Sequence, residues 1–106
     1  MMELVLLKSP YAGDIERNIE YARMCMKDSF KRGEAPFASH LLYTQEGILN
    51  DGVKQERDLG IEAGLEWGKL AELTAVYIDY GITSGMQYGI ENAYRNNRAV
   101  EFRKIL

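Results

Sequence analysis

The order of strand-like and helix-like patterns is the feature that most restricts the fold of this 106-residue chain. Met2 to Leu7 is a short apolar run and Thr74 to Asp79 is rich in β-branched residues, so both have the composition of buried strands. In three longer segments apolar residues recur every three or four positions, as in amphipathic helices: Asp14 to about Arg32, about Gln55 to Glu72, and Ser84 to Asn96. Such alternation predicts a mainly parallel sheet, because parallel neighbours need crossover connections.

Three shorter segments complete the predicted order of elements. Ala35 to Ala38 is a second strand whose Pro36 is tolerated at a sheet edge, and Ala99 to Ile105 is the last strand. Ser39 to Lys54 has no sustained period and contains turn residues, which indicates an extended loop with one helical turn. The length suits one domain, residues 1–106. The predicted fold is α/β: a single-domain, Rossmann-like three-layer sandwich with a four-stranded, mainly parallel sheet.

The predicted helices carry further signals in their ends and faces. Asp14 and Ser84 each stand where a side chain can cap the free backbone donors of a helix start. The helix that begins near Gln55 has an apolar face of Leu59, Ala63, Trp67 and Leu70 and a glycine face of Gly60, Gly64 and Gly68. Glycines at this spacing permit close contact, which indicates tight packing or a subunit interface. Because a small sheet also has exposed edges, we expect at least a homodimer.

Composition excludes several classes of partner and site. Thirteen basic against sixteen acidic residues give a net charge of −3 without a basic stripe, so a nucleic-acid polymer is not expected as a partner. No apolar run approaches the roughly 18 residues that a membrane span needs. The single cysteine, Cys25, and the single histidine, His40, cannot supply a four-ligand zinc site, and we expect no metal and no cofactor. The first residues lack the features of a signal peptide, so a cytoplasmic protein is expected.

Two strand-to-helix junctions are the expected binding places, because ligands of open parallel sheets lie at the carboxyl ends of the strands. The first is the loop from Ser9 to Asp14, and the second runs from Asp79 to Gly89. Both lead into helix N-termini, whose free N–H groups and positive dipole suit anionic or sugar-hydroxyl ligands. Neither contains the dinucleotide glycine fingerprint or the phosphate loop, so an ordinary turn is the alternative for the first.

Single residues near these junctions leave alternatives open. His40, just past the second strand, is either an acid, base or phosphate donor near neutral pH or a hydrogen-bonded structural histidine. Gly85 and Gly89 lie inside the last predicted helix, where glycine costs roughly 1 kcal/mol relative to alanine. Their missing side chains indicate either close approach of a ligand to the backbone or unusually tight packing.

Three segments carry a resemblance to a known family. They are Ser9-Pro10-Tyr11 followed by Arg17-Asn18, Leu65-Glu66-Trp67, and Ser84 to Gly89. Through them, and over nearly its whole length, the chain resembles the nucleoside 2-deoxyribosyltransferase superfamily, which includes nucleotide N-glycosidases and short, often phage-encoded relatives. The resemblance implies the Rossmann-like fold, a nucleotide-like small-molecule ligand, and a site formed by the first loop and the last helix.

The resemblance also implies a covalent mechanism, two parts of which are replaced in this sequence. Family members place a glutamate nucleophile two residues after the glycine of the last helix, where this chain has Gln87. The family's acid, just before the Leu-Glu-Trp stretch, matches Gly64. Because an amide is a poor nucleophile, this pattern implies a protein that binds and sequesters a nucleotide-derived molecule without cleaving it. One such protein would be a phage anti-defence protein that captures an ADP-ribose-type or cyclic-nucleotide signal.

The expected binding residues lie in the two junctions and in the segment between them. They are Ser9, Pro10, Tyr11, Gly13, Arg17, His40, Tyr43, Asp79, Gly81, Ser84, Gly85, Met86 and Gln87. The alternative function is N-glycosidic cleavage or 2-deoxyribosyl transfer on nucleosides or nucleotides. It would use a rearranged catalytic set of Asp79, Glu91 and His40.

Overall fold

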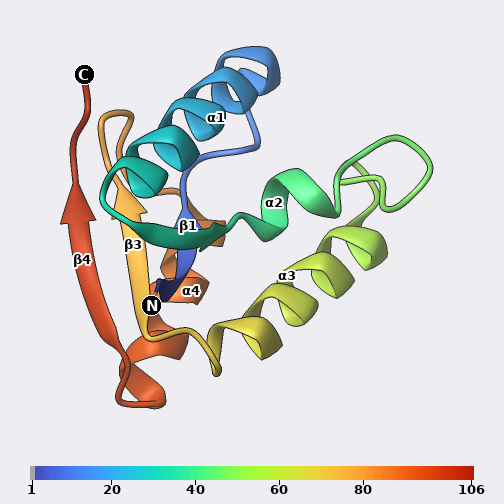
Figure 1. Cartoon of the computed structure of the whole chain (residues 1–106). Coiled ribbons are helices and arrows are strands. Elements are labelled where there is room, and N and C mark those ends of the chain that lie inside the picture. Colours follow the sequence, from blue (N-terminus) through green and yellow to red (C-terminus); the bar gives the residue numbers. More distant parts are fainter. Residues whose placement is uncertain (1) are drawn as a thin grey trace.

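Strands and helices alternate along the chain (Figure 1). The computed structural model describes residues 2–106. The strands are β1 (Glu3–Lys8), β2 (Glu34–Phe37), β3 (Leu73–Tyr77) and β4 (Ala99–Arg103). The helices are α1 (Ile15–Lys31), α2 (Ser39–Leu42), α3 (Lys54–Gly68) and α4 (Ser84–Arg95). Each predicted strand and helix is present, with ends that differ by a few residues, and α2 is the single turn expected in the loop after the second strand.

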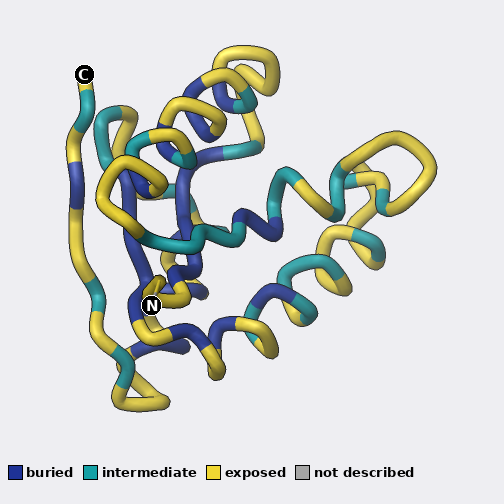
Figure 2. The backbone as a smooth tube through the Cα atoms, viewed as in Figure 1, coloured by how far each residue is buried: buried dark blue, intermediate teal, exposed yellow. Residues whose placement is uncertain are grey.

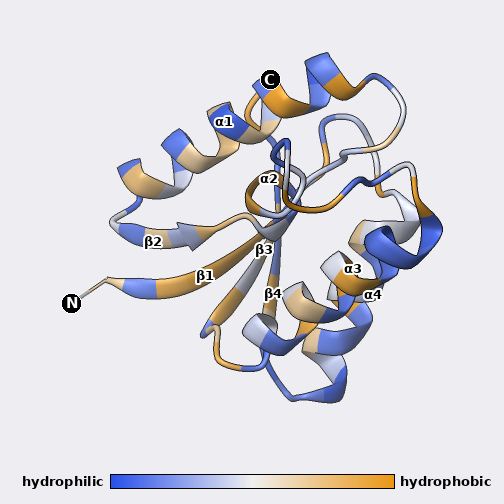
Figure 3. Ribbon diagram, turned by 90° about the vertical axis from the view of Figure 1, so that its right-hand side faces the viewer, coloured by the Kyte–Doolittle hydropathy of each residue, from blue (hydrophilic) through white to orange (hydrophobic). Residues whose placement is uncertain are grey.

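The four strands form one sheet in the order β2-β1-β3-β4, and every neighbouring pair is parallel. Figure 3 shows α1 on one face of the sheet and α3 with α4 on the other. The predicted three-layer α/β sandwich is therefore confirmed, and its sheet is parallel throughout. The chain leaves β1 toward the edge strand β2 and then returns to β3 on the other side of β1. The strand order thus reverses between β1 and β3, which is where such sheets open a crevice for ligands.

Alternating side chains of the central strands divide the core between the two faces. Val5 and Leu7 of β1 point toward α1 together with Tyr77 of β3, and all three are buried. Val76, the neighbour of Tyr77, points the other way and packs against Met86 of α4. Figure 2 shows both central strands buried over most of their length, whereas α3 is exposed over much of its surface. The sheet is accordingly the rigid element from which the loops at its carboxyl edge are held.

The apolar face and the glycine face of α3 have different surroundings. The large apolar residues of the first face are more than half exposed: Leu59, Trp67 and Leu70. The glycine face is turned inward instead. A Cβ atom on Gly64 would lie 2.6 Å from Ser39 Oγ, and one on Gly68 would lie 2.9 Å from Leu6 Cδ2. The glycines therefore let α3 approach α2 and β1 closely, and their spacing serves packing within the chain.

One of the two predicted helix caps is confirmed, and the other is the residue before the predicted one. Asp14 caps α1, where its Oδ1 accepts a hydrogen bond from the Arg17 backbone N–H at 3.2 Å. The cap of α4 is Thr83, whose Oγ1 accepts from the Met86 N–H at 3.3 Å. Ser84 is the first residue of the helix and not its cap. Thr83 is the cap because its backbone is extended, and its hydroxyl therefore reaches the N–H of the third helical residue.

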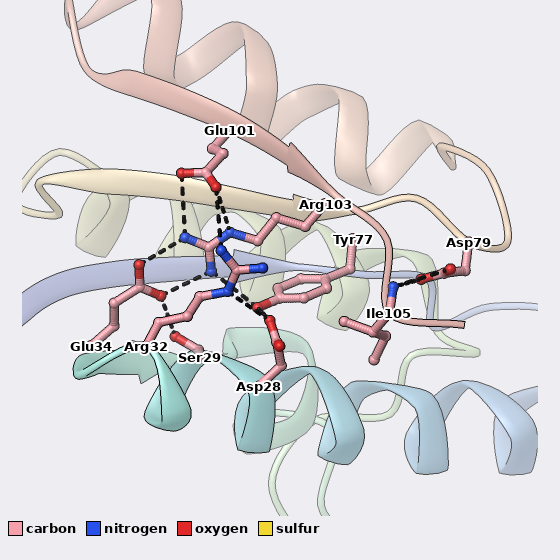
Figure 4. Close-up of polar contacts among 9 residues, drawn as sticks. All are labelled: Asp28, Ser29, Arg32, Glu34, Tyr77, Asp79, Glu101, Arg103 and Ile105. Carbon is pink, nitrogen blue, oxygen red and sulfur yellow. Dashed lines mark hydrogen bonds and ion pairs between the residues drawn. The ribbon is translucent and has the colours of Figure 1, made fainter.

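A buried arginine on the last strand, β4, connects that strand to β2 and, through Tyr77, to α1 (Figure 4). Arg103 of β4 is 4% exposed, and its guanidinium donates to both carboxylate oxygens of Glu34 on β2, at 2.8 and 2.7 Å. It also donates to the Tyr77 hydroxyl at 3.0 Å, and that hydroxyl donates to Asp28 of α1 at 2.8 Å. The hydrogen bonds from Arg103 lower the pKa of Glu34, so the pair stays charged at neutral pH. The cluster therefore fixes α1 and the two edge strands relative to one another.

Replacing this arginine should destabilise the whole domain. Arg103→Ala leaves the largely buried Glu34 carboxylate without its cationic partner, which costs about 3 kcal/mol of unfolding free energy. Urea denaturation followed by circular dichroism measures the loss, with Arg23→Ala, an exposed position on α1, as the matched control. Equal midpoints for the two variants would show that the cluster does not hold the domain together.

Candidate ligand-binding site

A cavity of about 330 Å³ lies at the carboxyl end of β1, next to the reversal of strand order. Its walls come from the β1–α1 loop, from α2 and the loop after it, from the first turns of α3, and from the N-terminus of α4. The buried part of the lining consists of Lys8, Ser9, Ser39 and Met86. Charged residues line the side formed by the α2–α3 loop and α3: Asp51, Lys54, Glu56, Arg57 and Asp58. The cavity therefore has a buried floor and a charged rim.

Lys8, the last residue of β1, supplies the positive charge of this floor. The residue is 9% exposed and lines the cavity. Its ammonium has no carboxylate within 4.0 Å and no hydrogen-bond partner among residues 2–106. Burial alone lowers the pKa of Lys8 to about 8, so the side chain is still mostly protonated at pH 7. An ammonium that lines a cavity without a carboxylate partner can attract an anion.

Gly89 of α4 makes the room that Lys8 occupies. A Cβ atom on Gly89 would collide with Lys8 Cε and would lie 3.0 Å from Cδ and 3.1 Å from Nζ. The lysine stem therefore crosses α4 at Gly89, where the helix has no side chain. This close approach explains a glycine inside the helix, and Lys8 lines the cavity.

His40 and Ser9 form a hydrogen-bonded pair beside Lys8. His40 Nε2 lies 2.7 Å from Ser9 Oγ, and both residues line the cavity. Burial, with a further contribution from the Lys8 charge, lowers the pKa of His40 to about 3. The imidazole is consequently neutral at physiological pH, so His40 cannot act there as a cationic phosphate donor. A neutral imidazole and a hydroxyl together can donate to and accept from sugar hydroxyl groups.

The N-terminus of α4 forms the wall opposite these polar groups. Thr83, Ser84, Gly85 and Met86 all line the cavity. The backbone N–H groups of Ser84 and Gly85 precede the first intrahelical hydrogen bonds, so they are free to bind a ligand. With the positive end of the helix dipole, they add to the attraction of the Lys8 ammonium for an anion.

The structure brings about half of the expected binding residues to this cavity. The residues that line it are Ser9, Tyr11, His40, Tyr43, Ser84, Gly85 and Met86. Gly13 lines an adjoining, more open hollow of about 760 Å³, which shares Tyr11, Thr44 and Arg57 with the cavity. The expected residues outside both hollows are Pro10, Arg17, Asp79, Gly81 and Gln87. Gln87 is exposed on α4, so the amide that was expected in the cavity is not there.

Asp79 and Arg17 are held in contacts on the α1 side of the sheet. The Asp79 carboxylate accepts hydrogen bonds from the Tyr21 hydroxyl and from the backbone N–H groups of Ile105 and Leu106. Burial raises the pKa of Asp79, but these hydrogen bonds outweigh it and the net shift is downward. Arg17 lies over the ring of Tyr80, with its guanidinium carbon 4.0 Å from the ring centre. Both side chains are therefore committed to structure, and Asp79 anchors the C-terminal residues (Figure 4).

The rearranged catalytic set is not assembled. Of its three members only His40 lines the cavity, since Asp79 is bound to the C-terminal backbone and Glu91 is exposed on α4. The residue that sequence reasoning missed is Lys8. The sequence feature that could have identified it is a basic residue placed directly after the apolar residues of the first strand and before the Ser9 loop.

No group of three or more histidine, cysteine, aspartate or glutamate side chains among residues 2–106 is placed to hold a metal ion. In the same range no helix combines the length and the apolar character required to cross a membrane.

Comparison with known proteins places the fold and the family. No curated protein matches the sequence. Among solved structures, the 2-deoxyribosyltransferase of the psychrotolerant bacterium Bacillus psychrosaccharolyticus is similar, with a TM-score of 0.72 and 18% identity over 94% of this chain and 71% of that one. The chain thus has a nucleoside 2-deoxyribosyltransferase-like fold. Residues 3–103 match the family model described as a domain of unknown function, DUF7768, and the chain therefore belongs to the DUF7768 family.

Proposed function

We propose that this protein binds a phosphorylated, nucleotide-like small molecule in the cavity at the end of β1 and does not cleave its N-glycosidic bond. The observation that carries the proposal is Lys8, a largely buried residue that lines the cavity and has no carboxylate within 4.0 Å of its amine among residues 2–106. The phosphate lies between Lys8 and the first turn of α4, where the N–H groups of Ser84 and Gly85 complete its coordination. If the ligand is released unchanged, the protein sequesters it. An ADP-ribose-type or cyclic-nucleotide signal is a ligand of this kind.

The other residues that line the cavity are suited to bind a sugar and a nucleobase next to the phosphate. The neutral pair of His40 and Ser9 matches the hydroxyl groups of a ribose, which both donate and accept hydrogen bonds. Tyr11 and Tyr43 line the cavity and offer aromatic faces to a nucleobase. The adjoining hollow begins at Tyr11 and extends past Arg57, which leaves room for a ligand larger than a mononucleotide.

The distribution of carboxylates supports binding over cleavage. Glycoside hydrolysis needs a carboxylate positioned at the anomeric carbon and a second acidic group. The buried floor of the cavity contains none. On the rim, Glu56 accepts a hydrogen bond from the Asn50 N–H at 3.0 Å, and Asp58 pairs with Lys54 at 2.7 Å. Glu56 and Asp58 are thus engaged in local contacts, and the third rim carboxylate, Asp51, also lies outside the buried floor.

Calorimetry tests the proposal directly. Titration with ribose 5-phosphate, deoxynucleoside monophosphates, ADP-ribose and cyclic dinucleotides should identify at least one ligand that binds the wild-type protein. Lys8→Met should weaken that ligand roughly 10- to 100-fold, because a charge-assisted hydrogen bond contributes about 1.5–3 kcal/mol. Lys69→Met, at an exposed lysine outside the cavity, is the control and should bind normally. Chromatography of the mixtures should recover the ligand intact, and a steady release of free base would contradict the proposal.

Binding should depend on pH through the charge of Lys8. Since the pKa of Lys8 is about 8, phosphate affinity should be retained below that value and should fall as the pH rises through it, when the ammonium loses its proton. The variant Lys8→Arg keeps its charge and should bind equally well from pH 7 to pH 9. This comparison separates Lys8 from the other titratable groups that line the cavity, which are Tyr11, His40, Tyr43, Asp51, Lys54, Glu56, Arg57, Asp58 and Tyr88. A parallel fall in both proteins would assign the pH dependence to one of those groups.

Gly89 offers a second test that leaves the ammonium in the chain. Gly89→Ala places a methyl group where the Lys8 stem lies, so the lysine must leave the cavity floor. Because a flexible side chain can move and alanine favours helix by about 1 kcal/mol, the domain should keep its thermal stability while ligand affinity falls. In the double variant Lys8→Met/Gly89→Ala, the alanine should cause no additional loss. Additive losses would mean that Gly89 contacts the ligand independently of Lys8.

A further inference from the structure

Lys8 has properties that an anion-binding lysine does not require. The residue is 9% exposed and lines the cavity, and no carboxylate lies within 4.0 Å of its amine among residues 2–106. Burial holds the pKa of Lys8 near 8, so about a tenth of the molecules carry a neutral amine at pH 7. A neutral amine on a desolvated lysine is a nucleophile toward carbonyl carbon.

The neighbours of Lys8 fit such a reaction. Gly89 leaves room for the lysine stem along α4, and Lys8 lines the cavity floor. The hydrogen-bonded pair of Ser9 Oγ and His40 Nε2, 2.7 Å apart, lines the same cavity and can pass a proton between nitrogen and oxygen atoms. The N-terminus of α4 remains available for a phosphate that the same ligand carries.

We infer that Lys8 captures the open-chain aldehyde of a phosphorylated sugar as a covalent imine in this cavity. The inference rests on the proposed function, because it uses the same phosphate position, and it names reducing sugar phosphates as the ligand class. Such molecules are released when an N-glycosidic bond of a nucleotide is hydrolysed, so a hydrolysis of that class would supply the ligand.

The step is a condensation that needs no further reactant. The Lys8 Nζ lone pair forms a bond to the aldehyde carbon, and the carbonyl oxygen takes a proton from the attacking nitrogen by way of Ser9 and His40. The carbon–oxygen bond of this carbinolamine then breaks, the oxygen leaves as water with the second nitrogen proton, and a carbon–nitrogen double bond forms. Protonation of the imine restores the positive charge at the floor, so the phosphate keeps its cationic partner.

Reductive trapping tests the inference. Wild-type protein is incubated at pH 7 with ribose 5-phosphate and sodium cyanoborohydride, and intact mass spectrometry with peptide mapping follows the reduced adduct. We expect one adduct per chain at Lys8, formed on the order of 10-fold faster than at the exposed Lys69. Ribitol 5-phosphate, which has no carbonyl group, should bind and protect Lys8. Ribose without phosphate should react at least about 10-fold more slowly, because it lacks the charge-assisted contacts at α4.

Two variants separate this inference from the proposed function. Lys8→Arg has no nucleophilic amine, so it should form no adduct in the cavity when it is incubated with ribose 5-phosphate and sodium cyanoborohydride. Lys69→Arg, the matched control, should form the Lys8 adduct at the wild-type rate. Binding of ribose 5-phosphate by the wild-type protein without a Lys8 adduct would overturn the inference and leave the proposed function standing. Absence of binding by every phosphorylated ligand would overturn the proposed function itself.

Discussion

The cost of burying an ammonium without a counter-ion is the constraint on which the functional site depends. An isolated buried charge costs several kcal/mol, and proteins usually remove this cost by pairing the charge or by shifting its pKa. At Lys8 the fold supplies no carboxylate, and burial has moved the pKa down to about 8. The fold also leaves the helix bare at Gly89 so that the lysine stem fits. A position with these features is unfavourable in the free protein and becomes favourable when an anion enters.

The two buried cationic residues of the sheet, Arg103 and Lys8, differ in the partners that surround them. Arg103 lies on the α1 face and is paired with Glu34, Tyr77 and Glu101. Lys8 lies against α4 on the opposite face and has no partner among the described residues. Asp79 belongs to the first kind, because its carboxylate holds the backbone of the C-terminal residues. Arg103 and Asp79 are therefore held by internal contacts, whereas Lys8 has none of this kind.

Local patterns predicted the fold well because short-range physics decides most of it. The β-branched run before Asp79 and the apolar run before Lys8 became the two central strands, and helical periodicity located α1 and α4. The glycine spacing of α3 predicted tight packing or a subunit interface, and the contacts of Gly64 and Gly68 are those of tight packing. The site was predicted only in outline. That Lys8 is buried depends on Gly89, far along the sequence, and the direction of Asp79 depends on the last residues of the chain.

The charge of Lys8 in solution is the most direct measurement of this arrangement. Nuclear magnetic resonance of protein carrying ¹³C-labelled lysine follows the Lys8 Cε signal through a pH titration, with and without a phosphorylated ligand. The free protein should show a Lys8 pKa near 8, and ligand binding should raise it, because an anion stabilises the ammonium. A Lys8 that titrates like an exposed lysine, and whose signal does not change when ligand is added, would contradict the assignment of this cavity as an anion site.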